Sequence, residues 1–204
     1  PDTGGFINAN YPPKKLIRND KNLKIVLSYA GSFLPGKGGL ETIFLAKYLK
    51  QFKFTLAGNL ERKLLNQINL IENINYFGYL DDDQIFDFYN ASDILIAPIG
   101  ERIFLDKSLK NEITFYTSPL KLYEYCFTNK PIITIDRPCT RVFRNMPGVW
   151  FVNKNKANCI NTWVEIINDV YKKEIKNKNS NLSNARKKYI YTWDRRINEM
   201  TKIK

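Results

Sequence analysis

The sequence predicts an α/β fold of the Rossmann-like kind, with one parallel sheet of about six strands and helices on both faces. Three observations predict it. Short apolar strands rich in β-branched residues alternate with segments of helical periodicity along the chain. Glycines and other turn residues follow several of these strands. The 204 residues are 44% hydrophobic, which is enough to bury both faces of such a sheet.

Residues 1–23 contain paired glycines and paired prolines and are expected to be an inter-domain linker, whereas residues 24–204 are expected to form one domain. The first expected helix has apolar residues at every third or fourth position, and the strands around it are short and apolar. The expected strands of this half are Lys24–Tyr29, Phe52–Ala57, Asn73–Phe77 and Asp93–Pro98. The expected helices are Leu40–Phe52, Leu60–Leu70 and one that begins at Asp81-Asp82-Asp83.

The acidic run at residues 81–83 has two interpretations. It directly precedes the apolar-periodic stretch of Ile85 and Phe86. At a helix start, a carboxylate caps free backbone N–H groups and complements the positive end of the helix dipole. A metal-binding acidic cluster is the sharper alternative, and capping is strongly favoured.

In the second half, Gly100–Phe115 has no clear period and is expected to be a long loop with room for a helical turn. Loops of this length are often functional. Pro119–Thr128 is expected to be a helix, because Ser118 suits its cap and proline suits its first turn. The remaining strands are Pro131–Ile135 and Val149–Val152, and the remaining helices are Asn158–Tyr171 and a basic helix from about Leu182 to Met200.

Composition excludes several classes of site. Histidine is absent, which removes Ser-His and Cys-His catalysis and histidine-based metal sites from this chain. The three cysteines are widely spaced and odd in number, which favours a reducing cytoplasm over a disulfide framework. The sequence shows no apolar run near the roughly 18 residues of a membrane span, and its first residues lack the pattern of a secretory signal.

The net charge is +12, and residues 154–204 hold 13 lysines and arginines against 5 acidic residues. A basic surface attracts nucleic acid, anionic lipid or phosphorylated ligands. A solvated face in a lysine-rich protein is an equally good interpretation of the composition.

The segment Gly31–Gly39 joins the first strand to the first helix, at the carboxyl edge where such sheets bind ligands. Its glycines allow close approach of a ligand, the following helix start favours an anion, and Lys37 adds a cation. It is neither a Walker loop nor a GxGxxG motif. A plain tight turn explains the glycines about as well.

The segment Tyr116–Tyr125, YTSPLKLYEY, lies at a second helix start on the same edge. Lys121 suits a phosphate, and Glu124, one turn later on the same face, suits the vicinal hydroxyls of a ribose. By spacing alone, a charge-paired helix face is the favoured interpretation.

Taken together, the two segments resemble the C-terminal domain of family 4 glycosyltransferases of the GT-B fold. AGSFLPGKGGLE, from Ala30, resembles the first-strand loop of that family, and SPLKLYEYCFTNKPIITID, from Ser118, resembles its donor-site helix and following strand. INYFGYLDDDQIFDFYNASDILIAP and NARKKYIYTWDRRINEM resemble the nucleobase strand with its following elements and the closing helix. The resemblance spans about residues 24–200.

The resemblance implies transfer of a sugar from a nucleotide donor with retention at the anomeric carbon. It implies that Lys37 holds the diphosphate and that Glu124 holds the ribose hydroxyls. The other expected donor-site residues are Leu120, Lys121 and Leu122 for the phosphates, Gly78 and Tyr79 for the base, and Gly31, Ser32, Gly38 and Ser118. We expect Lys37, Lys121 and Glu124 to carry catalysis. The lysines and helix N-terminal amides would stabilise the leaving diphosphate of a UDP- or GDP-linked sugar without a metal or other cofactor.

Two positions depart from the family pattern. Ser32 stands where the family has an arginine that contacts the diphosphate, and Tyr116 stands where it has a glutamate that contacts the donor sugar. Lys121 is expected to compensate.

The resemblance covers only one half of a two-domain enzyme. The acceptor site and a catalytic histidine are therefore expected in an N-terminal domain outside this chain, and the chain alone is expected to be inactive. The implied acceptor is a glycan or lipid-linked molecule of surface polysaccharide or glycoconjugate synthesis. The implied location is cytoplasmic and peripheral to the inner face of the membrane, with an anionic membrane surface as a further partner and no nucleic acid.

Two alternatives stay open. A GT-B nucleotide-sugar 2-epimerase shares the architecture, although the Ser-Pro-x-Lys-x-x-Glu pattern argues against it. A non-catalytic basic module that binds nucleic acid or membrane is the other. The aromatic residues of its basic helices are more typical of a core than of a stacking platform: Trp163, Tyr171, Tyr189, Tyr191 and Trp193.

Overall fold

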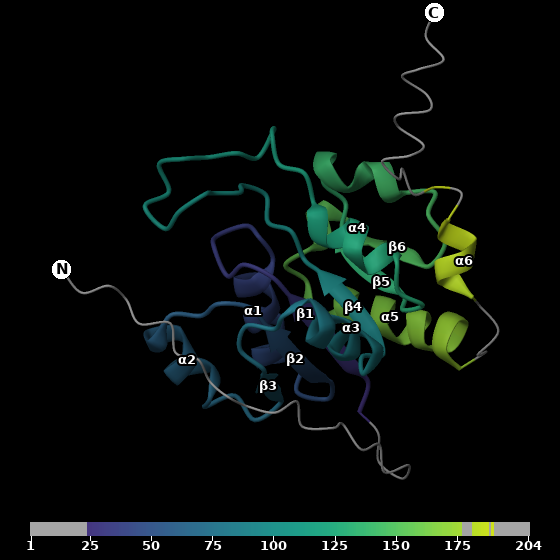
Figure 1. Cartoon of the computed structure of the whole chain (residues 1–204), viewed down its shortest axis with the longest axis horizontal. Coiled ribbons are helices and arrows are strands. Elements are labelled where there is room, and N and C mark those ends of the chain that lie inside the picture. Colours follow the sequence, from purple (N-terminus) through teal and green to yellow (C-terminus); the bar gives the residue numbers. More distant parts are fainter. Residues whose placement is uncertain (1–23, 177–180, 188, 190–204) are drawn as a thin grey trace, which may run out of the picture.

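The computed structural model describes residues 24–176, 181–187 and 189. The predicted linker, residues 1–23, lies outside this range. Within the range, the predicted fold is confirmed: six parallel strands form one sheet in the order β3-β2-β1-β4-β5-β6, surrounded by helices (Figure 1). The strands are β1 (Val26–Ala30), β2 (Lys53–Ala57), β3 (Ile74–Tyr76), β4 (Ile94–Ala97), β5 (Ile132–Ile135) and β6 (Val149–Val152).

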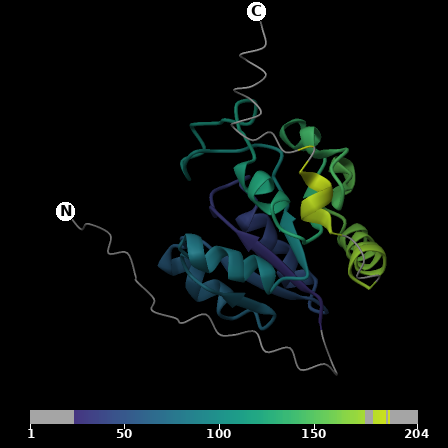
Figure 2. The same ribbon diagram turned by 45° about the vertical axis from the view of Figure 1, so that its right-hand side comes forward.

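Alternation of side chains along the strands divides the core into two layers. On one face, residues such as Leu27 and Ile94 pack with three helices: α1 (Gly39–Tyr48), α2 (Arg62–Ile68) and α5 (Ile160–Val170). On the other face, residues such as Ala30 and Leu95 pack with two helices: α3 (Asp82–Asn90) and α4 (Leu120–Cys126). Figures 1 and 2 show the sheet running between these layers. Both faces are covered, which explains why the strands are mostly apolar.

Most strands and helices lie within two residues of their predicted bounds. Within residues 24–176 the exception is α1, which ends at Tyr48 rather than at the predicted Phe52. Leu49 leaves the helical conformation, with φ −98° and ψ 55°, and its side chain is fully buried. The N–H of Phe52 then donates to the carbonyl of Leu49 (3.1 Å), which turns the chain directly into β2.

The start of α3 confirms the capping interpretation of the acidic run. The Asp81 carboxylate accepts a hydrogen bond from the N–H of Gln84 (2.9 Å), and the side chain of Gln84 accepts one from the N–H of Asp81 (3.2 Å). Asp82 and Asp83 lie in the first turn, where their charge complements the helix dipole.

The start of α4 differs from the prediction that Ser118 caps it. Pro119 is the cap residue, and no side chain caps the helix. Backbone carbonyls satisfy the first amides instead: the N–H of Leu120 donates to Ser118 and the N–H of Leu122 donates to Pro119, each at 2.9 Å. The tight turn before the helix removes the need for a hydroxyl cap.

The loop between β4 and α4 is irregular: over residues 98–119 it contains isolated hydrogen-bonded turns, such as the one closed by the Tyr116 N–H and the Ile113 carbonyl (2.9 Å), but no helix. It folds back on itself through an antiparallel bridge between Phe104 and Glu112. The Ile103 N–H donates to the hydroxyl of Thr114 (2.9 Å), and the Ile103 and Phe104 side chains are buried. These buried anchors hold the loop against the carboxyl edge of the sheet.

Three short elements connect the rest of the fold: η1 (Pro138–Phe143), η2 (Lys154–Lys156) and the π-helical turn η3 (Tyr171–Ile175) that continues α5. Trp163 of α5 is buried in the core, whereas Tyr171 and Tyr189 are partly exposed. None of the helices in the described part of the chain is long and apolar enough to cross a bilayer.

The described part of the predicted basic helix is the short α6 (Leu182–Arg186), and residues 190–200 lie outside the described range. Arg186 is fully buried between α6 and the carboxyl end of α4. Its guanidinium donates to four backbone carbonyls, those of Tyr125, Thr128, Lys130 and Pro147. This contact holds α6 against α4.

Candidate functional site

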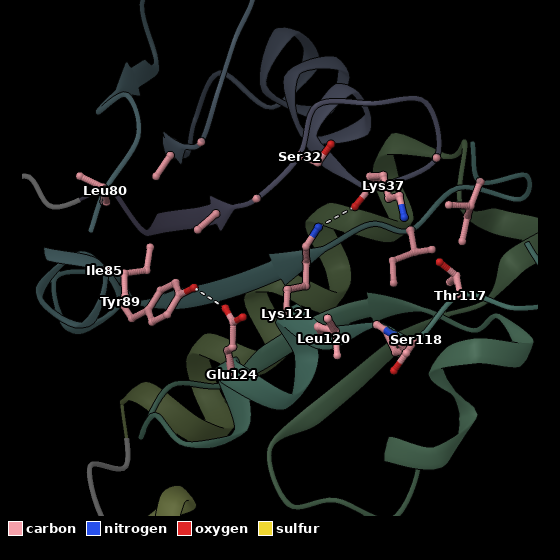
Figure 3. A pocket seen from close by; sticks show the side chains of 18 of the residues that line it. Ser32, Lys37, Leu80, Ile85, Tyr89, Thr117, Ser118, Leu120, Lys121 and Glu124 are labelled. Carbon is pink, nitrogen blue, oxygen red and sulfur yellow. Dashed lines mark hydrogen bonds between the residues drawn. The ribbon is translucent and has the colours of Figure 1, made fainter. Parts of the chain in front are cut away.

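A cavity of about 480 Å³ lies at the carboxyl edge of the sheet, between the loop after β1 and the start of α4 (Figure 3). β1 and β4 are neighbours, but the helices that follow them, α1 and α4, lie on opposite faces of the sheet. The two connecting loops therefore run in opposite directions and leave a crevice between them. The volume is in the usual range for a small-molecule site. The lining residues are Ala30, Gly31, Ser32, Gly36, Lys37, Ala57, Gly58, Tyr79, Leu80, Ile85, Tyr89, Ile99, Ile103, Thr117, Ser118, Pro119, Leu120, Lys121 and Glu124.

The glycine loop, defined as Gly31–Gly39, forms one wall of this cavity. Glu41 of α1 braces the loop, because its carboxylate accepts hydrogen bonds from the N–H groups of Gly36 (3.1 Å) and Gly38 (3.0 Å). Burial raises the pKa of Glu41, while these backbone hydrogen bonds and the charge of Lys121 act in the opposite direction. Two amides of the loop are therefore bound to Glu41.

Two glycines of this loop are required by close approach. A Cβ at Gly36 would lie 1.9 Å from the carbonyl oxygen of Arg102, and φ there is +78°. A Cβ at Gly31 would lie 3.0 Å from both Cε and Nζ of Lys121, and φ is +141°. Only residues without a side chain let the loop pack here and admit the lysine.

Lys121 reaches from α4 across the cavity to the opposite wall. Its Nζ donates to the hydroxyl of Tyr29 (2.6 Å) and to the carbonyl of Lys37 (2.7 Å). Both hydrogen-bond acceptors of the amine are neutral oxygens, so the ion pair with Glu124 that spacing alone favoured is not formed. Burial first, and then the positive charge of Lys37, lower the pKa of Lys121 to about 7.

Lys37 lies on the glycine loop beside this amine. Burial lowers the pKa of Lys37, and nearby Cys139 acts in the opposite direction. Figure 3 shows Lys37, Lys121 and Glu124 following one another along the cavity. Two cationic side chains thus lie near each other, which favours an anion between them.

Glu124 lies on the opposite side of Lys121 and is exposed. Its Oε2 accepts a hydrogen bond from the hydroxyl of Tyr89 on α3 (3.2 Å). Burial raises the pKa of Tyr89, and the charges of Tyr125 and Glu124 raise it further, so the tyrosine remains a phenol that can donate. The carboxylate is oriented and keeps acceptor capacity for a ligand.

The structure brings together eight of the predicted donor-site residues along the cavity: Gly31, Ser32, Lys37, Tyr79, Ser118, Leu120, Lys121 and Glu124. Three others are absent from its lining. Gly38 is buried with its N–H bound to Glu41, Gly78 accepts from the N–H of Gly58 (2.7 Å), and the Leu122 side chain is in the core.

The two positions that depart from the family pattern differ in location. Ser32 lines the cavity and is exposed, with its hydroxyl accepting from the N–H of Leu34 (3.2 Å). Tyr116 is 89% exposed and lies outside the lining. The Tyr116 side chain therefore does not form part of the cavity wall.

Sequence reasoning missed three residues that shape the site, Tyr29, Glu41 and Tyr89, and it gave no role to Tyr125, the last residue of the predicted donor segment. Glu41 could have been found, because it stands three residues after Gly38, the position from which a glutamate reaches back to a helix cap. Tyr125 accepts from the N–H of Ala30 (3.0 Å) and ties α4 to β1. That contact joins residues far apart in the chain, so local patterns carry no signal of it.

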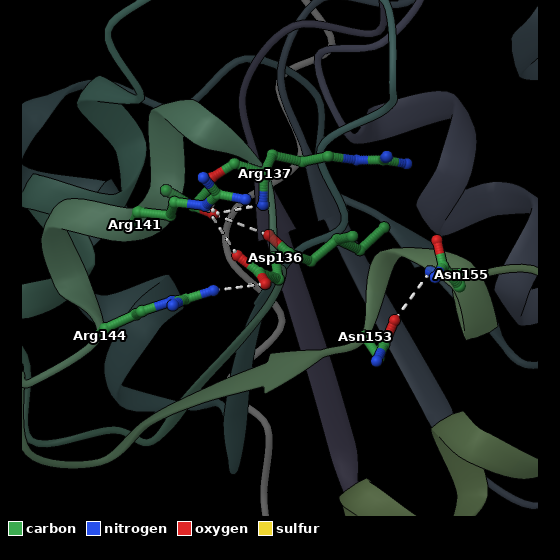
Figure 4. A network of polar contacts seen from close by, with 8 residues as sticks. Asp136, Arg137, Arg141, Arg144, Asn153 and Asn155 are labelled. Carbon is green, nitrogen blue, oxygen red and sulfur yellow. Dashed lines mark hydrogen bonds and ion pairs between the residues drawn. The ribbon is translucent and has the colours of Figure 1, made fainter.

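A basic cluster follows β5 on the same edge of the sheet (Figure 4). Asp136 binds Arg144 at 2.6 Å and Arg141 at 3.5 Å, and the Nε of Arg137 donates to the carbonyl of Ile99 (3.4 Å). Ile99 also lines the cavity. The single carboxylate leaves this cluster positively charged, in keeping with the basic charge of the chain.

No protein-family model matches the sequence, and no sequence among curated proteins matches it. Solved structures do. A glycosyltransferase from Rickettsia africae matches with a TM-score of 0.60 and 19% identity, over 90% of this chain and 48% of that chain. Sucrose-phosphate synthase from Thermosynechococcus elongatus matches with a TM-score of 0.60 and 18% identity, over 88% and 44%. A mutant of S. aureus TarM in complex with fondaparinux, alpha-GlcNAc-glycerol and UDP matches with a TM-score of 0.58 and 16% identity, over 91% and 37%.

The chain spans less than half the length of each of these structures. At such identities the likeness concerns the fold. The chain therefore has the Rossmann-like α/β fold that is present in these GT-B glycosyltransferase structures.

Proposed function

We propose that this chain is the nucleotide-sugar-binding half of a retaining glycosyltransferase of family 4, which takes a UDP- or GDP-linked sugar. The observation that carries the proposal is the amine of Lys121. It lies in the wall of a cavity of about 480 Å³, on two neutral oxygens and beside a second lysine. An amine held at a cavity wall by neutral oxygens, beside a second lysine, is suited to an anionic ligand, and a diphosphate is the anionic group of a nucleotide sugar.

In this proposal Lys37 and Lys121 bind the diphosphate between them. When the bond to the sugar breaks, negative charge develops on the leaving diphosphate, and two preplaced cations stabilise that charge. The acceptor hydroxyl then attacks the anomeric carbon from the face that the diphosphate leaves, and its proton passes to the departing phosphate oxygen, which gives retention. No side chain of this chain needs to act as a base.

Glu124 is proposed to bind the ribose. An ionised carboxylate can accept hydrogen bonds from both vicinal hydroxyls, and Tyr89 orients it from α3. The nucleobase is proposed to lie beside Tyr79, which lines the cavity and is 73% exposed.

The acceptor is proposed to come from the other half of the enzyme. This chain covers less than half of the matched structures, so an N-terminal domain with the acceptor site is part of the proposal. The acceptor is a glycan or a lipid-linked sugar of surface polysaccharide or glycoconjugate synthesis. The net charge of +12 supports a location at the cytoplasmic, anionic face of a membrane.

Calorimetry with UDP, GDP and ADP tests the proposal on the 204-residue chain. UDP or GDP is expected to bind, and Lys121→Met is expected to weaken binding about tenfold or more, because a charge-assisted hydrogen bond to phosphate is lost. Glu124→Gln is expected to weaken nucleotide binding but to leave binding of inorganic pyrophosphate unchanged.

Lys63→Met, an exposed lysine of α2, and Glu165→Gln, an exposed glutamate of α5, are the matched controls. The proposal is wrong if the wild-type chain binds none of the three nucleotides. It is also wrong if Lys121→Met binds UDP or GDP as the controls do.

A further inference from the structure

We propose that Tyr29 is a positioning residue for the diphosphate site, and that its hydroxyl holds the Lys121 amine at the cavity wall so that nucleotide binding takes up a proton at Nζ. The inference rests on the proposed function, because it assumes that Lys121 meets a diphosphate.

Tyr29 is built to hold a group at the cavity wall without lining the cavity itself. Its side chain is fully buried, with its ring edge-to-face against Phe33 at 5.6 Å between centroids. Its single O–H proton is shared between the carbonyls of Ser32 (2.6 Å) and Lys37 (3.0 Å). The hydroxyl oxygen therefore keeps a lone pair for the N–H of Lys121, which lies 2.6 Å away.

The same hydroxyl also ties the lysine to the glycine loop. Lys121 and Tyr29 both bind the carbonyl of Lys37, so three groups meet at one point. An ammonium has three N–H donors, and these contacts use two of them. The third is available to a phosphate oxygen, so an incoming ligand does not have to displace the two existing hydrogen bonds.

Burial and the charge of Lys37 shift Nζ of Lys121 toward its neutral form in the absence of an anion. Lys37 on the glycine loop opposes a second positive charge, whereas Glu41 on α1 and Glu124 on α4 favour it. Burial is the largest influence, and the pKa of Lys121 is lowered to about 7. Burial also raises the pKa of Tyr29, so the tyrosine stays protonated.

A diphosphate beside Nζ changes this balance. Its negative charge favours the ammonium, so the pKa of Lys121 rises when the ligand binds and a proton moves from solvent to Nζ. Above pH 7 the fraction of a proton taken up for each ligand bound grows toward one. The proton balance involves no covalent step and no other reactant.

The experiment is calorimetry of UDP binding to the 204-residue chain at pH 7.5 and 8.5, in buffers of different ionisation enthalpy. At these values the phosphates of UDP are fully ionised. The wild-type chain is expected to take up a proton fraction that approaches one at pH 8.5, and to bind UDP several-fold more weakly there than at pH 7.5. Lys121→Arg is expected to bind UDP with no proton uptake, because arginine stays charged.

Tyr29→Phe keeps the buried ring and removes the hydroxyl. The ammonium then loses one of its acceptors, so its pKa is expected to fall further. UDP affinity at pH 7.5 is expected to fall about tenfold, with a larger proton uptake at that pH. Tyr76→Phe is the matched control, because its hydroxyl also donates to a backbone carbonyl, that of Gly58 (2.5 Å), at the same edge of the sheet.

Gly31→Ala is a second variant that leaves Tyr29 intact. Its Cβ would lie 3.0 Å from Nζ of Lys121 and is expected to push the amine from the hydroxyl, with the same change in proton uptake. Circular dichroism verifies that each variant is folded.

The inference is overturned if the wild-type chain binds UDP without proton uptake, or if folded Tyr29→Phe matches Tyr76→Phe in affinity and uptake. In either case weak binding by Lys121→Met leaves the proposed function standing. Absence of UDP and GDP binding to the wild-type chain overturns both.

Discussion

Replacing Arg186 by methionine tests whether the carboxyl end of α4 is held by α6. Methionine keeps much of the aliphatic volume of arginine but cannot donate hydrogen bonds. Arg186 is fully buried, and its guanidinium donates to the carbonyls of Pro147 (2.8 Å), Thr128 (3.0 Å) and Lys130 (3.0 Å), with a longer bond to Tyr125 (3.4 Å). The substitution therefore removes the guanidinium donor from four carbonyls, two in buried and two in partly buried contacts.

The expected loss in free energy of unfolding follows from the number of carbonyls that lose a donor. The Tyr125 carbonyl also accepts from the hydroxyl and the N–H of Thr128, so it keeps partners. The other three each lose the guanidinium donor. At about 1 kcal/mol for each lost hydrogen bond to the charged guanidinium, the expected loss in free energy of unfolding is about 3 kcal/mol. The free energy needed to detach α6 from α4 sets the upper limit of the loss.

Urea denaturation followed by tryptophan fluorescence measures this loss, with the free energy extrapolated to water. Lys187→Met is the matched control, because it removes an exposed cation one residue further along and is expected to change stability by less than about 0.5 kcal/mol. A loss below about 1 kcal/mol for Arg186→Met would refute the reasoning, because water or α6 itself would then satisfy the carbonyls at little cost.

Three further predictions concern the loop, the cap and the titration of the site. Gly36→Ala should weaken UDP binding more than tenfold with the sheet retained by circular dichroism, because its Cβ would lie 1.9 Å from the carbonyl of Arg102; unchanged affinity would contradict this. Asp81→Ala should lower the free energy of unfolding in urea by about 1 kcal/mol, since it removes the cap of α3, and Asp82→Ala should cost less. The pKa of Lys121 is lowered from 10.5 to about 7, so above pH 7 the unfolded chain binds more protons at this group than the folded chain does. Its contribution to stability should therefore rise with pH between 7 and 9, by up to about 1 kcal/mol per unit, and a Lys121→Met chain with the same pH profile as the wild type would rule this out.

The architecture could be predicted from local patterns because the apolar periodicity and the turn or cap residues of each strand and helix lie within a few residues of one another. The apolar segment at β4 and the capped start of α3 are examples, and both lie where they were expected. The end of α1 could not be predicted, because Leu49 continues the helical periodicity and leaves the helix only to fill the core. The burial of Leu49 depends on the sheet and not on its neighbours in sequence.

The sequence predicted the residues of the site but not all of their partners, because the partners come from distant segments. Lys121 and Glu124 stand one turn apart, and the sequence alone favoured an ion pair between them. In the structure Lys121 turns to Tyr29 and Lys37, and Glu124 turns to Tyr89. These partners come from β1, the glycine loop and α3, so only the packing of α4 against the sheet decides between the two arrangements.

By itself, the sequence determined the parallel α/β fold, the glycine loop and the residue types that suit a diphosphate and a ribose. Periodicity and turn chemistry are local, so they can be read along the chain. The tertiary structure alone decided that the two segments, about 80 residues apart, face each other across one cavity. It also decided that Tyr29 and Glu41 hold them, because those contacts arise when the carboxyl ends of neighbouring parallel strands meet at one edge.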